Sequence, residues 1–157
     1  MYKTRKELDC DNYTRRVLSW RVIDGDTVQV WLDMGYEFVH CPVIRLLGIN
    51  APELTGANKD AGQCSKNHLI TVLSSATEDP AEPVPIWCRS VKVRDKQKHS
   101  KALKEKYGRY LAMLFIGGIS PVNCVNLQMV DSGHAVRYGG GLSQELLKCF
   151  PGKTNGQ

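Results

Sequence analysis

The sequence predicts an α+β fold in which a small five-stranded β-barrel carries about three helices. Three observations support this prediction. Three extended segments fill the first third of the chain, a segment with helical spacing follows the third of them, and two more extended segments and further helical ones come later. The chain has 157 residues, which suits one domain with a proper hydrophobic core.

The first two strands are expected over residues 13–23 and 27–32. The first is rich in β-forming residues, and the second alternates between two kinds of side chain. The dipeptide Asp24-Gly25 between them is a hairpin signal, since glycine tolerates the positive φ that such turns need. The apolar residues expected on one face of the second strand are Val28, Val30 and Leu32.

A proline interrupts the region of the third strand. Residues 36–41 follow a second turn and are expected to be extended, and Pro42 then breaks the run because it lacks a backbone N–H. Residues 43–49 form the third clear strand, and Gly48 near its end indicates a bulge or a close backbone approach.

The middle of the chain is predicted to hold a helix, a loop, a strand and a basic segment. Residues 61–76 have helical spacing, residues 78–85 are rich in proline, and residues 84–93 are typical of a strand. Residues 89–109 are rich in lysine and arginine, which predicts either a solvated surface segment or a flap that attracts the nucleic-acid backbone. The residues predicted to contact nucleic acid are Lys92, Arg94, Lys96, Lys98, Lys106 and Tyr107.

The C-terminal third is expected to hold a strand, a helix, a short extended piece and a final helix. Their predicted ranges are residues 110–116, 122–132 and 135–138, with Ser143 as the N-cap of the last helix. Five short, twisted strands with a helix after the third are compatible with a small closed barrel such as the OB-fold.

A single domain is expected over residues 13–150. Residues 1–12 are polar and charged and predict a flexible N-terminal arm, and residues 151–157 predict a disordered tail. The formal net charge of +5 mildly favours a polyanionic partner. No apolar run is long enough to span a membrane and no secretory signal is present, so we expect a cytoplasmic, intracellular monomer unless a signal was removed beforehand. The six cysteines form no Cys-x-x-Cys pair, which argues against a zinc site and suits a reducing compartment.

The segment from residue 44 to residue 53 concentrates the residues that carry chemistry. Arg45 lies within an apolar run, and a buried arginine is costly without an anionic partner. Glu53 is one candidate partner, and a ligand that faces both residues is the other. We expect this segment to surround a divalent cation and a phosphodiester together with three further residues, namely Asp24, Asp26 and Arg109.

Four blocks of the sequence form a highly specific set. They are Val22-Ile-Asp-Gly-Asp-Thr-Val28, Arg45-Leu-Leu-Gly-Ile-Asn-Ala-Pro-Glu53, Lys106-Tyr-Gly-Arg-Tyr-Leu-Ala112, and Val125-Asn126 with Gly133-His-Ala135. In this order they resemble the thermonuclease family, the staphylococcal nuclease-like proteins, and the turn at residues 32–36 is similar to that of members from phages, plasmids and environmental bacteria. The resemblance implies an OB-fold barrel with three helices and a calcium-dependent endonuclease that acts on DNA or RNA.

The resemblance also implies a role for each residue of the predicted site. Arg45 and Arg109 clamp phosphate oxygens and stabilise the phosphorane-like transition state, because arginine is always charged and offers a planar pair of donors. Glu53 accepts a proton from the attacking water or orients that water. The oxygens implied to bind Ca²⁺ come from Asp26, Asn50 and the backbone carbonyl of Ala51, with Asp24 in support.

Asn50 departs from the family's pattern, in which an aspartate is usual at this position. Its amide oxygen can coordinate a metal ion but brings no charge, so we predict weaker Ca²⁺ binding or a preference for another divalent cation, which does not by itself imply that activity is lost. The alternative function is a non-catalytic nucleic-acid-binding OB module in which Asn50 marks a weakened metal site. A protein–protein adaptor that uses the barrel as a scaffold is the third hypothesis.

Structural roles are the alternatives for the residues of the predicted site. Asp24 and Asp26 are also ordinary turn formers, Arg45 and Glu53 can form an ion pair, and Arg109 can be a solvated residue at a strand end. The four histidines have no metal-like spacing and are interpreted as structural.

Overall fold

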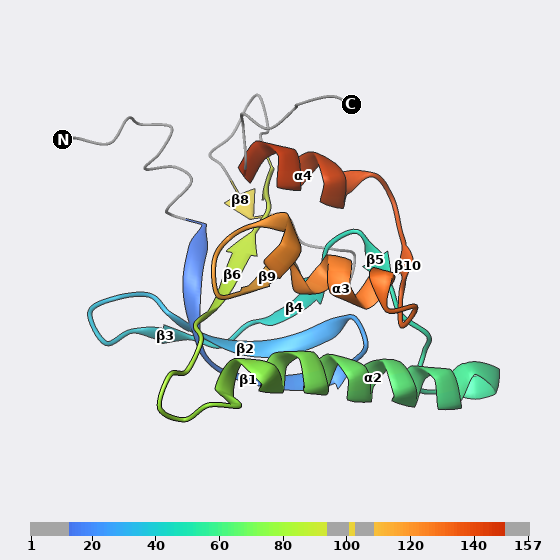
Figure 1. Ribbon diagram of the computed structural model, residues 1–157. Coiled ribbons are helices and arrows are strands. Elements are labelled where there is room, and N and C mark those ends of the chain that lie inside the picture. The colour runs from blue at the N-terminus through green and yellow to red at the C-terminus, as the bar shows by residue number, and fades with distance from the viewer. Residues whose placement is uncertain (1–12, 94–100, 103–108, 150–157) are drawn as a thin grey trace.

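The computed structural model describes residues 13–93, 101–102 and 109–149. The predicted arm of residues 1–12 and the predicted tail of residues 151–157 lie outside the described residues. Figure 1 shows the described chain as a set of strands with helices packed against their outer side.

Five strands close into a barrel. β1 (Thr14–Asp24) pairs with β2 (Thr27–Asp33) on one side and with β6 (Ile86–Ser90) on the other. β4 (Val43–Leu46) pairs with β2 and with β9 (Tyr110–Ile116), and β9 also pairs with β6. The contact between β1 and β2 completes the ring, and this arrangement confirms the predicted α+β fold with a closed, five-stranded, OB-like barrel.

The order of the strands departs from a simple meander after the third barrel strand. β9 lies between β4 and β6 and runs parallel to β4, whereas the other barrel pairs are antiparallel. A parallel pair needs a long crossover connection, and the chain between β4 and β9 supplies it with a helix and the strand β6. The start of β9, where Arg109 lies, is thereby brought beside β4, where Arg45 lies.

Alternating residues of the strands fill the barrel. The predicted inner face of β2 is confirmed, since Val28, Val30 and Leu32 are buried. Opposite them lie the apolar side chains of β4 and β9, which are almost fully buried. The residues from these two strands are Ile44, Leu46, Ala112 and Leu114. One continuous hydrophobic core therefore joins strands that are far apart in the sequence.

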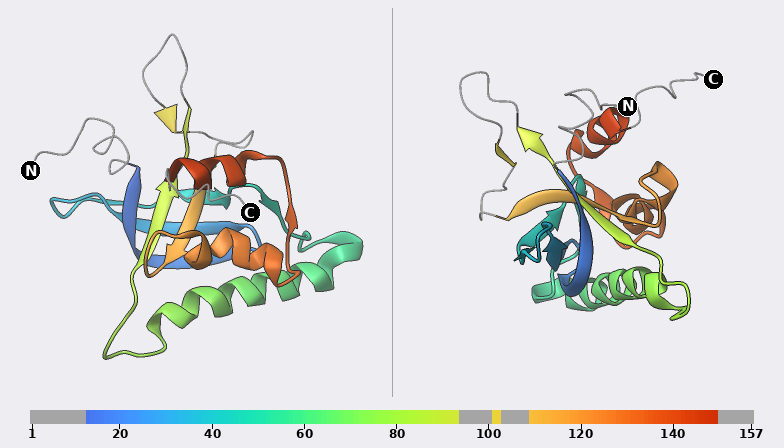
Figure 2. Two further views of the ribbon diagram at one scale, coloured as in Figure 1. Left: turned by 45° about the horizontal axis from the view of Figure 1, so that its top comes forward. Right: turned by 90° about the vertical axis from the view of Figure 1, so that its left-hand side faces the viewer.

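Three α-helices cover the outside of the barrel. They are α2 (Lys59–Ser74), α3 (Val125–Asp131) and α4 (Gly141–Cys149), and short 3₁₀ helices lie beside the first two, at η1 (Gly56–Asn58), η2 (Ser75–Thr77) and η3 (Pro121–Asn123). The predicted helices of residues 61–76 and 122–132 correspond to α2 and α3. In both Figure 1 and Figure 2, α2 and α4 lie on opposite sides of the strands. Within the described part of the chain, no helix has the length and apolar character needed to cross a membrane.

The last helix begins two residues earlier than predicted. α4 starts at Gly141, so Ser143 is not its N-cap; instead, the Ser143 hydroxyl accepts a hydrogen bond from Arg137 Nη1 at 3.4 Å. The earlier start follows from packing, because Leu142 is buried against Gly48, where a Cβ would collide with the Leu142 side chain. Gly48 thus marks the close approach that its position predicted.

The predicted strand of residues 36–41 is mostly a turn. Only β3 (Val39–His40) is extended, and it pairs with the end of β2. Tyr36 and Glu37 have positive φ values of 52° and 65°, which reverse the chain before β3 begins. The local run of β-forming residues therefore gives way to a longer turn than the sequence indicated.

The predicted strand of residues 43–49 is divided by a turn. After β4, Gly48 has a positive φ of 74°, and the chain continues as β5 (Ile49–Asn50). β5 leaves the barrel and pairs with β10 (Val136–Arg137), which confirms the short extended piece predicted near the C-terminus. This division places Asn50 in the ladder with β10, outside the barrel.

The predicted strand of residues 84–93 is also divided. Beyond β6, the strand β7 (Lys92–Val93) pairs with β8 (Lys101–Ala102) in an antiparallel ladder. The residues of the basic segment that lie outside the described residues are Arg94, Lys96, Lys98, Lys106 and Tyr107, and only the backbone of Lys92 is described. The interpretation of this segment as a nucleic-acid contact stays a prediction.

Candidate active site

A cavity of about 730 Å³ opens where the β1–β2 turn, the end of β4 and the start of β9 meet. All the residues that the sequence predicted as catalytic or metal-binding line it, although they come from three distant parts of the chain. They are Asp24, Asp26, Arg45, Asn50, Ala51, Glu53 and Arg109. The three segments therefore meet at one cavity, as the sequence predicted.

The turn that carries the two aspartates is held by close packing. Gly25 does not have the positive φ that its hairpin signal predicted. Glycine is needed there for space, because a Cβ would collide with Ser65 Oγ of α2 and would lie 2.7 Å from Ala51 Cβ. Ser65 is fully buried, and its hydroxyl donates a hydrogen bond to the carbonyl of His134 at 2.7 Å. The turn is thus fixed between α2 and the chain that follows β5.

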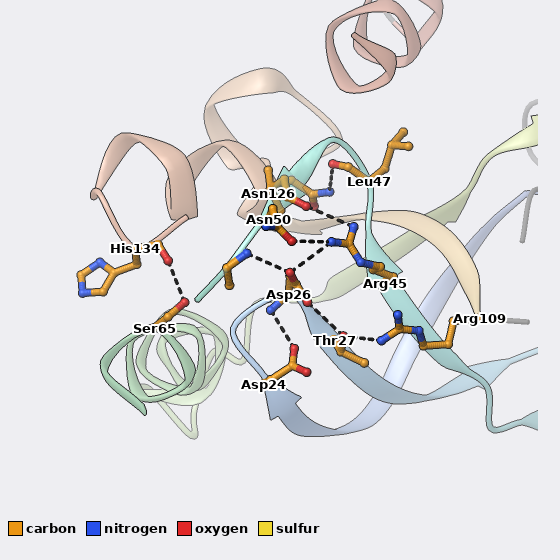
Figure 3. A network of polar contacts seen from close by, with 12 residues as sticks. Asp24, Asp26, Thr27, Arg45, Leu47, Asn50, Ser65, Arg109, Asn126 and His134 are labelled. Atoms are coloured by element: carbon orange, nitrogen blue, oxygen red, sulfur yellow. Dashed lines mark hydrogen bonds and ion pairs between the residues drawn. The ribbon is translucent and has the colours of Figure 1, made fainter. Parts of the chain in front are cut away.

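Asp26 is the acceptor at the centre of a polar network (Figure 3). Its Oδ2 accepts hydrogen bonds from the backbone N–H of Ala51 at 2.8 Å and from Arg45 Nη2 at 3.3 Å. Its Oδ1 accepts a hydrogen bond from Thr27 Oγ1 at 3.1 Å. Asp26 is only 7% exposed, so these donors compensate for much of the water that its carboxylate loses.

Arg45 has an anionic partner, and that partner is Asp26. Glu53, one of the two candidate partners that the sequence left open, forms no ion pair with Arg45; the salt bridge joins Arg45 Nη2 to Asp26 Oδ2 at 3.3 Å. The guanidinium also donates to the carbonyl of Ile49 at 3.1 Å and to Asn50 Oδ1 at 2.9 Å. It lies 5.8 Å from the ring centroid of Tyr138, within the range of a cation–π contact. The guanidinium is held at several points beside the open cavity.

Glu53 lies on the rim of the cavity and is exposed. Within the described residues, its carboxylate forms no hydrogen bond or ion pair with another side chain. The backbone beneath it is tightly packed, because a Cβ on Gly62 of α2 would lie 2.6 Å from the carbonyl carbon of Glu53. The start of α2 therefore positions the backbone of Glu53 and leaves its carboxylate accessible to solvent.

Arg109 reaches the same network from the start of β9. Its Nη1 donates a hydrogen bond to Thr27 Oγ1 at 3.1 Å, and Thr27 is only 2% exposed. The sequence did not indicate a role for Thr27. The alternation of β2 predicted only that Thr27 lies on the face opposite Val28 and Val30, outside the barrel. The available signal was its position directly after Asp26.

The two aspartates of the turn influence each other. The backbone N–H of Asp26 donates to Asp24 Oδ1 at 3.1 Å. Burial raises the pKa of the Asp24 carboxyl above its ordinary value, and the neighbouring Asp26 carboxylate raises it further. A bound cation would relieve this repulsion, because it favours the charged form of both groups.

Asn126 of α3 joins the two strands that carry the arginines. Its Nδ2 donates to the carbonyls of Leu47 at 3.0 Å and Ala112 at 3.1 Å, and its Oδ1 accepts from the N–H of Leu114 at 3.1 Å. The side chain is fully buried. Asn126 belongs to the fourth block of the resemblance, but only the folded chain reveals these contacts.

The oxygen donors of the cavity match a hard cation in type. Asp24, Asp26, Asn50 and the Ala51 carbonyl are all oxygen donors, which suit Ca²⁺ or Mg²⁺ rather than a soft metal. Only two of these four donors, Asp24 and Asp26, are carboxylates. The described residues hold no group of three or more His, Cys, Asp or Glu that could bind a metal ion. The donor set therefore fits a calcium ion in chemistry and predicts low affinity.

Comparison with known proteins gives no match to a protein-family model and none to a curated protein. The roles of the cavity residues therefore depend on their chemistry and on their arrangement.

Proposed function

We propose that this protein is a metal-dependent nuclease that hydrolyses phosphodiester bonds of DNA or RNA, with Ca²⁺ as the expected metal. One observation carries the proposal. Two guanidiniums from distant segments, Arg45 and Arg109, line the same cavity as the carboxylates of Asp26 and Glu53. A site for phosphodiester hydrolysis needs positive groups for the phosphate oxygens and an acidic group for water, and this cavity offers both.

The arginines supply charge stabilisation. A phosphodiester gains negative charge on its equatorial oxygens as water attacks, and a guanidinium placed beforehand stabilises that charge without reorganisation. Arg45 and Arg109 approach the cavity from β4 and from the start of β9, which lie side by side in a parallel pair. Each arginine is the natural partner of one phosphate oxygen, because its donors match phosphate geometry.

Glu53 is the proposed general base. Its carboxylate is exposed on the rim and makes no side-chain contact within the described residues, so it is available to a water molecule. It would take the proton of the attacking water or orient that water for in-line attack. Asp26 does not suit this role, because it is buried and salt-bridged to Arg45, and we propose it as a ligand of the metal ion instead.

The metal ion is proposed to bind beside the β1–β2 turn. Asp26, Asn50 and the Ala51 carbonyl are the proposed ligands, and Asp24 supports them from the same turn. When bound, the cation supplies Lewis-acid polarisation of the phosphate. Two carboxylates in the turn contribute the charge that attracts it.

A specific observation favours the alternative of a nucleic-acid-binding module without catalysis. Asn50 brings no charge, and its amide oxygen accepts a hydrogen bond from Arg45 at 2.9 Å. If that oxygen stays with the arginine, fewer oxygens remain for a metal ion. The barrel and the basic segment of residues 89–109 would then serve binding alone.

Digestion of plasmid DNA, single-stranded DNA and RNA with Ca²⁺, with Mg²⁺ or with a chelator tests the proposal. We expect cleavage that the chelator abolishes. Glu53→Gln and Arg109→Ala should each lower kcat/KM by roughly 10²- to 10³-fold, because each removes one of the groups proposed to act in the transition state.

Matched controls separate these effects from general ones. Glu82→Gln and Arg16→Ala make the same chemical changes at exposed positions outside the cavity and should leave the rate unchanged. Binding of an oligonucleotide without cleavage under any of these conditions would reject the enzyme and favour the binding module.

A further inference from the structure

We infer that Thr27 is a positioning residue whose hydroxyl group holds the Arg109 guanidinium beside Asp26. The inference concerns the same cavity and rests on the proposed nuclease function. Thr27 Oγ1 lies 3.1 Å from Arg109 Nη1 and 3.1 Å from Asp26 Oδ1. Its side chain joins two groups that are 83 residues apart in the sequence when counted from Asp26 to Arg109 and that line one cavity.

The chemistry of the partners fixes the direction of both hydrogen bonds. A guanidinium has only donors, and an ionised carboxylate has only acceptors. The Thr27 hydroxyl therefore donates a hydrogen bond to Asp26 and accepts a hydrogen bond from Arg109. Both bonds involve a charged group, and a hydroxyl between opposite charges is polarised by each of them. Serine could repeat this arrangement, whereas valine has the same shape and no hydroxyl.

The backbone of Thr27 is held as firmly as its side chain. It lies in register with Arg45 on β4 and with Asp24 on β1. The hydroxyl therefore projects from a strand that is paired on both sides. The backbone of Thr27 is thus paired with the strand that carries Arg45, and its hydroxyl contacts Arg109.

A continuous series of polar contacts results, as Figure 3 shows. Asn50 accepts from Arg45, Arg45 donates to Asp26, and Asp26 accepts from Thr27, which in turn accepts from Arg109. Each guanidinium thus reaches Asp26, one directly and the other through Thr27. Among the described contacts, the Asp26 carboxylate and the Thr27 hydroxyl form the polar link between the two guanidiniums.

Such positioning matters because an arginine side chain is long and flexible. An unrestrained guanidinium loses rotamer entropy when it meets a phosphate, and misplacement by about 1 Å can cost about 100-fold in rate. The hydroxyl of Thr27 restricts one end of Arg109 before the phosphate arrives. Thr27 does not touch the reacting atoms, so its effect should reach the rate through the two groups that it contacts, Arg109 and Asp26.

Thr27→Val and Thr27→Ser test the inference in the full-length protein. Thr27→Val should lower kcat by roughly 10- to 100-fold with little change in KM, because it removes a hydrogen bond that positions an arginine proposed to act in the transition state. Thr27→Ser should retain most of kcat. Thr71→Val is the matched control, since the Thr71 hydroxyl bonds only within α2 in the described contacts and lies outside the cavity.

A second measurement does not depend on cleavage. In ¹⁵N-labelled protein, NMR reports the rotation of each arginine guanidinium, which slows when the group is held by hydrogen bonds. The Arg109 signal, assigned by its loss in Arg109→Ala, should show faster rotation in Thr27→Val and wild-type rotation in Thr27→Ser. If wild type fails to cleave, the proposed function fails, and this measurement still decides the role of Thr27.

Three results would overturn the inference. Wild-type kcat in Thr27→Val would show that the hydroxyl is not needed. An equal loss of kcat in Thr27→Val and Thr27→Ser would show that the methyl packing matters instead. Unchanged Arg109 rotation in a folded Thr27→Val protein, verified by its circular dichroism spectrum, would show that Thr27 does not hold the guanidinium.

Discussion

Asn50 sets the charge of this cavity and the position of Arg45 at the same time. Its amide oxygen accepts a hydrogen bond from Arg45 Nη2 at 2.9 Å, and its strand β5 is held by β10. An aspartate in its place could accept the same bond, because the amide and the carboxylate have the same shape. The difference between the two residues is therefore one negative charge close to the proposed metal ligands.

We expect Asn50→Asp to strengthen Ca²⁺ binding by about tenfold or more, because a charge within a few ångströms of the ion contributes about 1 kcal/mol even in water. Isothermal titration with Ca²⁺ measures the dissociation constant without any need for cleavage. Asn67→Asp adds the same charge on the exposed face of α2, outside the cavity, and should not change it. An unchanged dissociation constant in Asn50→Asp would contradict the interpretation of Asn50 as a charge deficit.

At the scale of elements, α3 determines how two strands meet. The Asn126 side chain adds three hydrogen bonds between them, because it donates to two carbonyls and accepts from one N–H. Leu47 also donates its N–H to the carbonyl of Ala112 at 2.9 Å. The turn after β4 is thereby fixed to β9, and the strands that carry Arg45 and Arg109 keep a constant relation.

Asn126→Asp should lower the free energy of unfolding by about 2–4 kcal/mol, because it removes the side-chain donor to the carbonyls of Leu47 and Ala112 and places a charge beside them in the core. Urea denaturation followed by circular dichroism measures the change. Asn123→Asp is the matched control, since it removes a single donor, to the carbonyl of Gly118, at an exposed contact. Its cost should stay below about 1 kcal/mol. Equal costs for the two variants would show that the buried contacts of Asn126 do not stabilise the fold.

At the scale of the whole molecule, a pair of histidines joins α2 to the loop that follows α3. The rings of His68 and His134 are stacked, with centroids 3.9 Å apart and planes at 2°. Burial lowers the pKa of His68 below its ordinary value of 6.5, and the nearby His134 lowers it further. The same loop receives the Ser65 hydroxyl, so the contact lies beside the support of the β1–β2 turn.

The free energy of unfolding should therefore fall as the pH is lowered from about 7 to about 5. The folded state binds a proton at His68 less readily than the unfolded chain does. The contribution of neutral His68 to stability is therefore fully present above pH 6.5, and it is lost as the pH falls through the lower pKa of the folded state. Urea midpoints across this range should decrease less steeply in His68→Gln than in wild type. His40→Gln, which changes a histidine outside this pair, should keep the wild-type slope. Parallel slopes for wild type and His68→Gln would refute the linkage.

Much of the barrel follows from local patterns in the sequence. The alternation in residues 27–32 identifies the inner face of β2, and helical spacing locates α2 and α3 to within a few residues, because apolar periodicity records which side of an element meets the core. The turn at Tyr36 and Glu37 was missed, since its positive φ values accompany the backbone pairing of β2 with β3, which local β-propensity does not reveal.

The sequence by itself determined the class of fold, the inner face of its strands and the residues that carry charge into the site. Only the tertiary structure decided the partners of those residues. Arg45 pairs with Asp26, 19 residues away, rather than with Glu53, and Arg109 meets Thr27 across 82 residues. Local spacing cannot choose between such partners, because the choice depends on which strands the closure of the barrel places side by side.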